Sequence, residues 1–272
     1  MDVTVVINAF TNQMRAIYAL FMREMLTRYG DRKLGFLWSI VEPLAHVGVF
    51  WLIRYYRGFM PPDGVSLILF LVSGIIPFFY FRDVASKGPT ALSSNQGLLD
   101  FPNLSISDFF VARYFLETAA GLLTFLMSIV VAFNLEPVIN LTYTTSQWQI
   151  NDALLVLGIF FLMGLIGFGW GLITSALKIF LPSVTIISNT IIRILYLTSG
   201  VIFSIKIIPE RYYDILYYNP FVHCMEIIRG GFFQAYFPKE VFQDVNYVIT
   251  FALILIFLGV ILVASTKRFA LR

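Results

Sequence analysis

Charged residues are scarce in this chain. Asp, Glu, Lys and Arg make up only 13% of its 272 residues, against about 25% in a typical soluble domain. Hydrophobic residues reach 58%, and the mean hydropathy is +0.81. No soluble core of this size needs so much apolar surface, so the composition predicts a chain that has lipid as its solvent. The net charge of +3 then says nothing about nucleic acid; the positions of the charges matter instead.

Residues that build catalytic or metal sites are scarce too. A single cysteine, Cys224, excludes an internal disulfide and a cysteine-based metal cluster. His46 and His223 lie far apart, and we interpret the spacing of His223 and Glu226 as a surface or interface pair. No G-x-x-x-x-G-K-[ST] loop and no Ser-His-Asp or paired-carboxylate pattern occurs. The sequence predicts no catalytic centre, no metal site, no cofactor and no cleavable signal peptide.

Long apolar runs dominate what is present. A spanning helix needs about 20 apolar residues, and six segments approach that length. The second is short, and Pro77 within it predicts a kinked helix. The predicted fold is therefore an all-α integral membrane protein, with one transmembrane domain over residues 1–272. The six predicted spans cover residues 34–53, 67–81, 109–133, 153–177, 184–203 and 248–264.

The segment before the first span is predicted to be an amphipathic helix over residues 13–28. It carries too much charge to span, so we expect it to lie flat at the membrane interface, with rings in the headgroups and arginines toward anionic lipid. An ordinary soluble helix is the alternative. The apolar residues at helical spacing are Met14, Ile17, Tyr18, Phe21 and Met25.

Positive charges predict the orientation. With both termini in the cytoplasm, most Lys and Arg residues fall on the cytoplasmic side, as the positive-inside rule requires. Glu42 is then left inside the first span, one or two turns from that face. Its carboxylate either pairs with Arg28, Arg32 or Lys33 or extends to the surface. The predicted cytoplasmic cations are Arg15, Arg23, Arg28, Arg32, Lys33, Arg82, Lys87, Arg113, Lys178, Lys267, Arg268 and Arg272.

Two connections are too long to be simple turns. The cytoplasmic one, over residues 84–104, is either a solvated loop or a docking element with a few apolar anchors. The external one, over residues 204–246, predicts a re-entrant helical hairpin. Pro209 and Pro220 suit first helical turns, Asn219 suits an N-cap, and Gly230 with Gly231 predicts the end of the second helix.

Glycines, aromatic residues and one arginine complete the pattern. Gly164, Gly167 and Gly171 lie within the fourth span and favour close helix packing over phosphate binding. Arg193 lies within the fifth span, so it faces a partner or water, or else extends to the cytoplasmic surface. Aromatic rings that are amphipathic can stack on sugars, although a lipid-facing belt explains them equally well. The tyrosines in question are Tyr55, Tyr56, Tyr212, Tyr213, Tyr217 and Tyr218.

Four blocks carry a specific resemblance. "ALFMREMLTRYGDRKLGFLWSIVEPLAHV", "SGIIPFFYFRD", "LLDFPN" and "YNPFVHCMEIIRGGFF" occur in this order over nearly the whole chain. They resemble the capsule polysaccharide export permeases, the KpsM-type membrane subunits of ATP-binding-cassette exporters. Teichoic-acid and O-antigen permeases share a similar plan, and the first block is the most selective for capsule.

The resemblance implies a homodimer in the bacterial inner membrane. Each six-span subunit would couple to a separate ATPase subunit, and a lipid-linked acidic polysaccharide would leave between the protomers, with a periplasmic co-polymerase continuing the route. Arg193 and Arg211 would then attract the acidic polymer alongside the tyrosines. Residues 13–28 would be the interface helix, and the loop near Asn95 would dock in the ATPase. The implied coupling residues are Arg23, Arg28, Asn95, Leu98 and Leu99.

Two alternatives remain at this point. Within transport, the substrate could be teichoic acid, O-antigen or a small hydrophobic compound. In another class, the chain could be a membrane glycosyltransferase or polymerase, but it has neither an acidic metal-binding cluster nor a large cytosolic domain.

Overall fold

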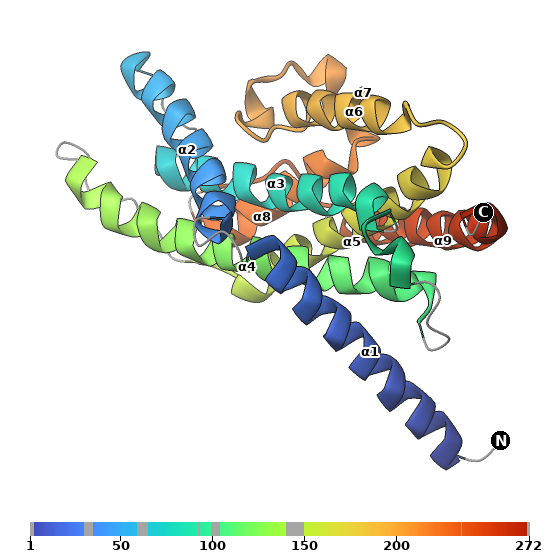
Figure 1. Ribbon diagram of the computed structural model, residues 1–272. Helices are drawn as coiled ribbons and strands as arrows, with labels where there is room; N and C mark the ends of the chain where they lie inside the picture. Colours follow the sequence, from blue (N-terminus) through green and yellow to red (C-terminus); the bar gives the residue numbers. More distant parts are fainter. Residues whose placement is uncertain are drawn as a thin grey trace.

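The computed structural model describes residues 3–29, 35–58, 65–91, 93–98, 104–139, 150–234 and 236–270, and throughout these ranges the regular structure is helical without strands (Figure 1). The long helices are α1 (Val3–Tyr29), α2 (Gly35–Tyr56), α3 (Leu67–Ala91), α4 (Ile106–Ile139), α5 (Ala153–Lys178), α6 (Val184–Thr198), α8 (Pro220–Phe232) and α9 (Val245–Ala270). The short ones are α7 (Tyr213–Tyr217) and the 3₁₀ turns η2 (Ser93–Leu98), η3 (Ile205–Ile207), η4 (Glu210–Tyr212) and η5 (Glu240–Phe242).

Four described stretches are long and apolar enough to cross a bilayer: Leu67–Ala91, Ile106–Leu135, Ala153–Lys178 and Glu240–Thr266. They confirm an integral membrane architecture. α6 is a shorter apolar helix. α2 covers the predicted first span but carries polar residues, Glu42, His46 and Arg54. The total of six spans stays a prediction.

α3 forms the centre of the bundle, packed between α4 and α5 (Figure 1). Glycines bring α5 into direct contact with it, as the sequence predicts. A Cβ on Gly164 would stand 1.9 Å from the Tyr80 hydroxyl, and one on Gly88 would stand 2.6 Å from Cα of Gly171. Small residues that let helix backbones approach are the usual basis of packing inside membranes.

Two of the predicted spans end at other residues than the helices that contain them. α3 does not stop at Phe81 but continues through Arg82 to Ala91, because the polar residues of its last turns find partners on neighbouring helices. α6 stops at Thr198 rather than at residue 203. Gly200 follows with φ of 71°, a left-handed conformation that glycine adopts without strain, and the chain turns away there.

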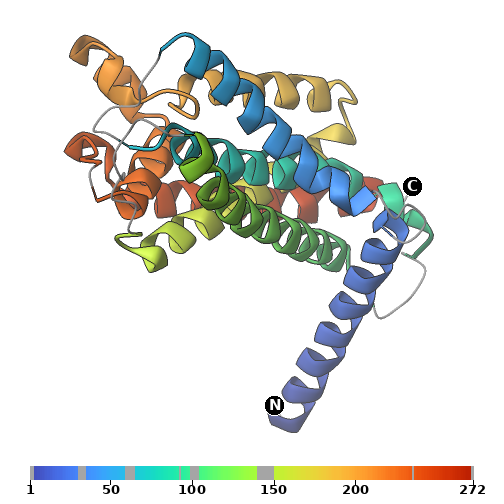
Figure 2. The same ribbon diagram turned by 90° about the vertical axis from the view of Figure 1, so that its left-hand side faces the viewer.

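The amphipathic helix is longer than predicted, since α1 begins at Val3 instead of residue 13. Its packed face also differs from the predicted one. Ile17 and Leu20 are buried, whereas Tyr18 is 64% exposed and Met14 is 43% exposed. The C-terminal half of α1 contacts α4, and the N-terminal half leaves the bundle (Figure 2).

The connection over residues 204–246 contains the expected second helix. Pro220 starts α8, and the Asn219 side chain accepts a hydrogen bond from the Phe221 N–H, which is the predicted N-cap. The predicted stop at Gly230 and Gly231 is wrong, because α8 runs on to Phe232. The described residues of α8 are almost all buried, against α3, α5 and α9, so this helix is part of the core.

Candidate functional site

An open groove lies between α2, α3 and α6, and basic and aromatic side chains line it. We call it the basic groove and define it by His46 of α2, Phe79 and Arg82 of α3, and Asn189, Arg193 and Tyr196 of α6. The predicted candidate Arg193 is exposed here, in the C-terminal half of α6. The groove thus presents cations in a setting otherwise built from apolar helices.

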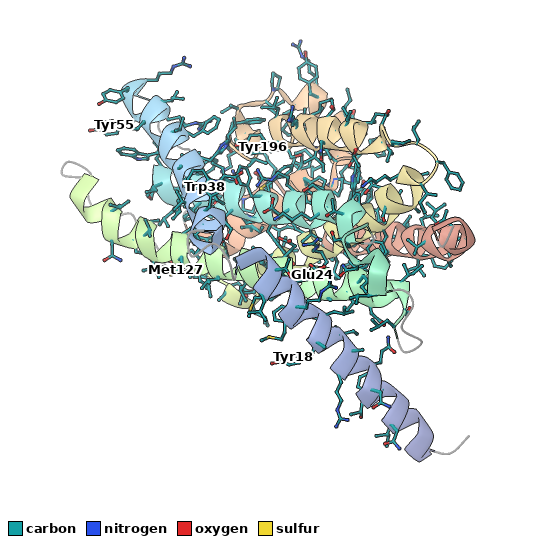
Figure 3. All side chains as sticks on the ribbon, in the orientation of Figure 1. Tyr18, Glu24, Trp38, Tyr55, Met127 and Tyr196 are labelled. Atoms are coloured by element: carbon teal, nitrogen blue, oxygen red, sulfur yellow. The ribbon has the colours of Figure 1, made fainter. Side chains whose placement is uncertain are left out.

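One aromatic wall of the groove ties the three helices together. His46 and the Tyr196 hydroxyl share a hydrogen bond of 2.7 Å, and the His46 ring centroid lies 4.9 Å from that of Phe79. Figure 3 shows the position of Tyr196, which belongs to α6. Buried tyrosine hydroxyls need such a partner, so the bond fixes the ring and with it the spacing of α2 and α6.

Arg82 of α3 lines the groove and forms an ion pair with Glu42 of α2. Its guanidinium lies 3.9 Å from the Phe79 ring centroid and reaches Glu42 Oε1 at 3.3 Å and Asp83 Oδ1 at 2.8 Å. The described partner of the first-span carboxylate therefore comes from α3. The sequence interpretation left open a pair with a cation preceding α2 or extension to the surface, and it missed Arg82 because the pair spans forty residues of sequence.

The ion pairs continue from there into α4. Lys87 Nζ lies 3.0 Å from Asp83 Oδ2 and 2.9 Å from Glu117 Oε2, and the Glu117 side chain is only 2% exposed. A charge that deeply buried persists only with a partner. Together with Arg82 and Glu42, these residues form a chain of alternating charges that links α2, α3 and α4.

A second polar cluster joins α1, η2 and α4, and we call it the α1–η2 junction. Asn95 is 3% exposed. Its Nδ2 donates to Glu24 Oε1 over 2.9 Å and to the Ala91 carbonyl over 2.7 Å, while Arg23 Nη1 donates to its Oδ1 over 2.7 Å. Arg113 of α4 lies 2.9 Å from Glu24 Oε2. The structure thus brings together two of the predicted coupling residues, Arg23 and Asn95.

Apolar contacts surround this junction. Leu98, at the end of η2, packs against the cluster of Ile17, Leu20 and Phe109. Leu98 is therefore only partly exposed, because it packs against the chain's own core. Leu99 and the side chain of Arg28, the other predicted coupling residues, lie outside the described residues.

Comparison with known proteins identifies the family. The model of the ABC-2 type transporter membrane domain matches residues 15–233, most of the chain. The chain belongs to the ABC-2 type transporter family.

Individual relatives cover nearly the whole ABC-2 chain. The polysialic acid transport protein KpsM of Escherichia coli is 29% identical over 96% of this chain and 97% of its own length. The capsule polysaccharide export inner-membrane protein CtrC of Neisseria meningitidis serogroup B is 26% identical over 94% and 92%. The O-antigen export system permease protein RfbA of Klebsiella pneumoniae is 21% identical over 88% and 87%.

The tyrosines predicted for the ABC-2 transport path separate into two groups. Tyr55 and Tyr56 lie at the C-terminal end of α2, where Figure 3 labels Tyr55. Tyr55 stacks on Trp51 with ring centroids 5.2 Å apart. The other four lie in η4 and α7 and just after it. Tyr212 and Tyr218 are exposed there, and Arg211 lies 4.8 Å from the Tyr212 ring.

Two rings of that second group face inward. Tyr213 and Tyr217 pack on the buried cluster of Ile205, Val222 and Phe242. Tyr217 also stacks on Tyr247 at 5.8 Å. Tyr212 and Tyr218 are thus exposed, whereas Tyr213 and Tyr217 hold residues 204–246 together by packing on this cluster.

The sequence interpretation missed a buried arginine of the ABC-2 domain. Arg229 in α8 is fully buried, and its guanidinium donates to the carbonyls of Val201 at 2.9 Å and Phe203 at 3.2 Å. It also lies 3.8 Å from the Phe70 ring centroid of α3. Arg229 therefore satisfies the backbone where α6 has ended, which apolar surroundings demand.

One turn earlier, Glu226 of α8 anchors the chain that follows. Its Oε1 accepts from the Tyr236 hydroxyl at 2.5 Å, and its Oε2 accepts from the Lys239 N–H at 3.2 Å. Burial, together with the nearby Glu226 carboxylate, raises the pKa of Tyr236, so the phenol stays a donor. The signal available in sequence was the i, i+3 spacing of two charges in an otherwise apolar helix.

Within the part of the chain that the structure describes, no group of three or more His, Cys, Asp or Glu residues is arranged to hold a metal ion. Several of the described charged residues of this ABC-2 subunit are instead paired across helices, as in the chain from Glu42 through Arg82, Asp83 and Lys87 to Glu117.

Proposed function

We propose that this chain is the membrane-spanning permease subunit of an ATP-driven exporter that moves lipid-linked acidic capsular polysaccharide out of the cytoplasm. The observation that carries the proposal is the similarity to KpsM and CtrC over more than nine tenths of the chain. ATP hydrolysis takes place on a separate subunit, in keeping with membership of the ABC-2 family.

The subunit works as a homodimer in the bacterial inner membrane. The basic groove is open on one side, and a second copy facing it would close the two grooves into one passage. Both termini lie in the cytoplasm, which puts α1, η2 and the start of α4 on the ATPase side and α7 and α8 on the outer side. A periplasmic co-polymerase receives the polymer there.

Coupling runs through the α1–η2 junction. Residues of η2 contact both the ATPase and, through Asn95 and Glu24, the interface helix α1. From there α4 carries Arg113 and Glu117, which contact α1 and α3 respectively. A displacement of η2 is thus transmitted by charged contacts to Arg82 and Glu42 at the inner end of the groove.

O-antigen polysaccharide is the second candidate substrate, favoured by the similarity to RfbA at 21% identity. Teichoic acid and small hydrophobic compounds have no specific observation in their favour. Membership of the ABC-2 family argues against a glycosyltransferase or polymerase.

Reconstitution tests the proposal. The chain is co-purified with a candidate ATPase in lipid nanodiscs, and ATP turnover is measured with capsular polysaccharide, with O-antigen polysaccharide and without polymer. We expect a stable complex whose turnover changes with the capsular polymer. A complex that responds only to O-antigen supports the second candidate, and one that responds to neither contradicts polysaccharide export.

A further inference from the structure

The imidazole ring of His223 in α8 is enclosed by aromatic rings from three other elements. His223 is fully buried. Its ring centroid lies 5.1 Å from that of Tyr217 in α7, 5.8 Å from that of Phe242 in η5 and 5.1 Å from that of Tyr247 in α9. A phenyl ring would fill this space equally well, so the reason for a histidine here lies in its two ring nitrogens.

Both nitrogens of His223 are bonded to backbone groups, and these groups fix the protonation of the ring. Nε2 lies 2.9 Å from the carbonyl oxygen of Tyr217, and Nδ1 lies 3.4 Å from the backbone nitrogen of Asp244. A carbonyl oxygen can only accept and a backbone N–H can only donate, so Nε2 carries the proton and Nδ1 carries none. The arrangement therefore needs a neutral ring, which links the end of α7 to the residue just before α9.

Two further side chains hold the same corner between α7 and α8. The Tyr247 hydroxyl donates to the carbonyl of Tyr218 over 2.8 Å, and Asn219 Nδ2 donates to Ser199 Oγ over 2.9 Å. Neither of these groups changes its charge near neutral pH, whereas a histidine does. His223 is thus the contact of this corner that a change in pH can break.

We propose that His223 is a pH-sensitive latch, which holds the C-terminal end of α7 to the start of α9 while the ring is neutral and releases them when the ring takes up a proton. Protonation puts a second N–H on Nδ1, where it faces the N–H of Asp244, and two donors cannot share a hydrogen bond. The ring then has to turn or leave its place. Either movement removes a partner from the Tyr217 carbonyl or from the Asp244 N–H.

Asp244 is the charged side chain that acts on the His223 ring. Its Oδ1 accepts from the Tyr247 N–H over 2.9 Å in the first turn of α9, and its Oδ2 accepts from the Tyr217 hydroxyl over 3.4 Å. A protonated ring attracts this carboxylate and competes with both donors. Protonation therefore disturbs the start of α9 as well as the end of α7.

The other charged side chains on α8 and on the elements around it are engaged with other groups or exposed. Those that are ion-paired, hydrogen-bonded or placed over a ring are Arg82, Asp83, Lys87, Asp152, Lys178, Lys206, Glu226, Arg229 and Lys239. The exposed ones are Glu210, Arg211, Asp214 and Glu240. The response of the latch to pH is therefore governed by His223 and Asp244.

The direction of the response follows from the burial of the ring. Burial lowers the pKa of His223 below its ordinary value of about 6.5, although the bond to the Tyr217 carbonyl and the charge of Asp244 oppose this shift. A released ring regains the ordinary pKa, so above about pH 6.5 the ring is neutral in both states and the latch keeps its full strength. Below that pH only the released ring takes up a proton, which favours release by up to about tenfold per pH unit until the pH reaches the lowered pKa of the closed ring.

Hydrogen exchange of the full chain in phosphatidylcholine nanodiscs tests the latch. Exchange is measured by mass spectrometry at pH 7.5 and pH 5.5 and corrected for the intrinsic pH dependence of amide exchange. We expect the opening of residues 213–219 and 242–247 to rise about threefold to tenfold at the lower pH, with no rise in α5. Carboxylates with an ordinary pKa near 4 stay charged throughout this window. No rise in the wild-type protein would overturn the inference without any variant.

Two histidine variants assign the response to one ring. His223→Gln keeps a side-chain N–H for the Tyr217 carbonyl but has no group that titrates in this window, so its exchange should be equal at both pH values. His46→Gln removes the other of the two histidines of the chain and should respond to pH as the wild type does. A full response in His223→Gln, or its loss in His46→Gln, contradicts the latch.

A second measurement on the wild-type ring does not depend on the folding of a His223 variant. Nitrogen NMR of protein labelled with ¹⁵N-histidine should show His223 as the neutral tautomer with its proton on Nε2 at pH 7.5, and the His46→Gln spectrum assigns the signal. A proton on Nδ1, or a charged ring at that pH, would overturn the inference. Neither measurement involves polymer or ATP, so the outcome is independent of the proposed function.

Discussion

Asn95 in η2 donates a hydrogen bond to Glu24 in α1 over 2.9 Å, and the two residues are 71 positions apart in the sequence. Both are buried, at 3% and 8% exposure. This hydrogen bond holds η2 against α1, and the apolar contacts of Leu98 with Ile17 and Leu20 add to it. It gives the proposed coupling region a defined geometry before any ATPase binds.

Substitution of Asn95 tests this region. Asn95→Leu removes the partners of Arg23 and of one Glu24 oxygen, and a buried group left unpaired costs about 1–3 kcal/mol. We expect the variant to insert into the membrane but to lose polymer-stimulated ATP turnover. Gln243→Leu, the same kind of change at an exposed position outside the junction, is the control and should behave as wild type. Unchanged coupling in Asn95→Leu would show that the junction is dispensable.

The close packing of α5 on α3 predicts that alanine lowers the thermal stability at Gly164 but not at Gly158. Gly164→Ala places a Cβ 1.9 Å from the Tyr80 hydroxyl, whereas Gly158→Ala, on the same helix, meets nothing within 4 Å. Overpacking of this kind costs about 1–3 kcal/mol. Thermal unfolding in detergent should therefore show a lower Tm for Gly164→Ala and an equal or higher Tm for Gly158→Ala. Equal Tm values for both variants would mean that α3 and α5 can separate at little cost.

Arg229 should be essential for folding of the external region. Arg229→Met keeps much of the volume but leaves the carbonyls of Val201 and Phe203 without their donor in buried surroundings. We expect membrane levels of the protein to fall severalfold. Lys239→Gln, which breaks only the exposed pair with Glu210, should keep wild-type levels. Quantitative immunoblotting of membranes compares the levels of the two variants. Normal levels of the Arg229→Met variant would show that Arg229 is not needed for folding.

Topology is testable by labelling of single cysteines. Native Cys224 is fully buried, so a Cys224→Ser background is compatible with introduced thiols. Gln243 and Ser94 are both exposed, on the proposed outer and cytoplasmic sides. An impermeant maleimide applied to intact spheroplasts should label Gln243→Cys but not Ser94→Cys. The reverse pattern would invert the assigned orientation.

The exposed tyrosines offer a test of the polymer route. Stacking losses of about 0.5–1.5 kcal/mol per ring predict mild effects from Tyr→Phe and strong slowing from the paired change Tyr55→Ala with Tyr56→Ala. The inward pair, Tyr213 and Tyr217, should instead lower protein levels when truncated, because these rings pack on the core. Surface polysaccharide per unit of permease separates the two effects. If the variant with both Tyr55→Ala and Tyr56→Ala exports as much surface polysaccharide as the wild type, these rings only contact lipid.

Local sequence rules predicted the elements well where one signal dominated. The apolar runs gave the long helices, Asn219 with Pro220 gave the start of α8, and the glycines of α5 gave its close contact with α3. Each of these depends on residues that are near neighbours in sequence or on composition alone.

Features that depend on distant partners were missed. Charge after Phe81 suggests the end of a span, yet Arg82 and Lys87 find Glu42 and Glu117 on other helices and α3 continues. Gly231 suggests a helix stop, yet its carbonyl accepts from the Asp152 N–H and the glycine lets α8 approach the start of α5. No single-sequence rule states which remote residue will arrive at a given position.

The residues of the basic groove likewise include one that the sequence indicated and several that it did not. Arg193 was found because a cation inside an apolar run is visible in sequence. His46, Phe79 and Tyr196 were not assigned to it, because three helices must pack before their rings meet.

The free half of α1 gives the subunit a lever. Contacts hold the helix from Gln13, whose side-chain amide donates to Asp108 of α4, through Ile17 and Leu20, while Ile7 and Phe10 remain exposed at 57% and 64%. Figure 2 shows the N-terminal end of α1 projecting from the bundle. At 1.5 Å per residue, residues 3–12 of α1, before this fulcrum, extend roughly 15 Å, so a tilt of about 10° at the fulcrum moves the tip through roughly 2–3 Å. A small rotation of α1 against α4 therefore becomes a larger displacement at the N-terminal end of the helix.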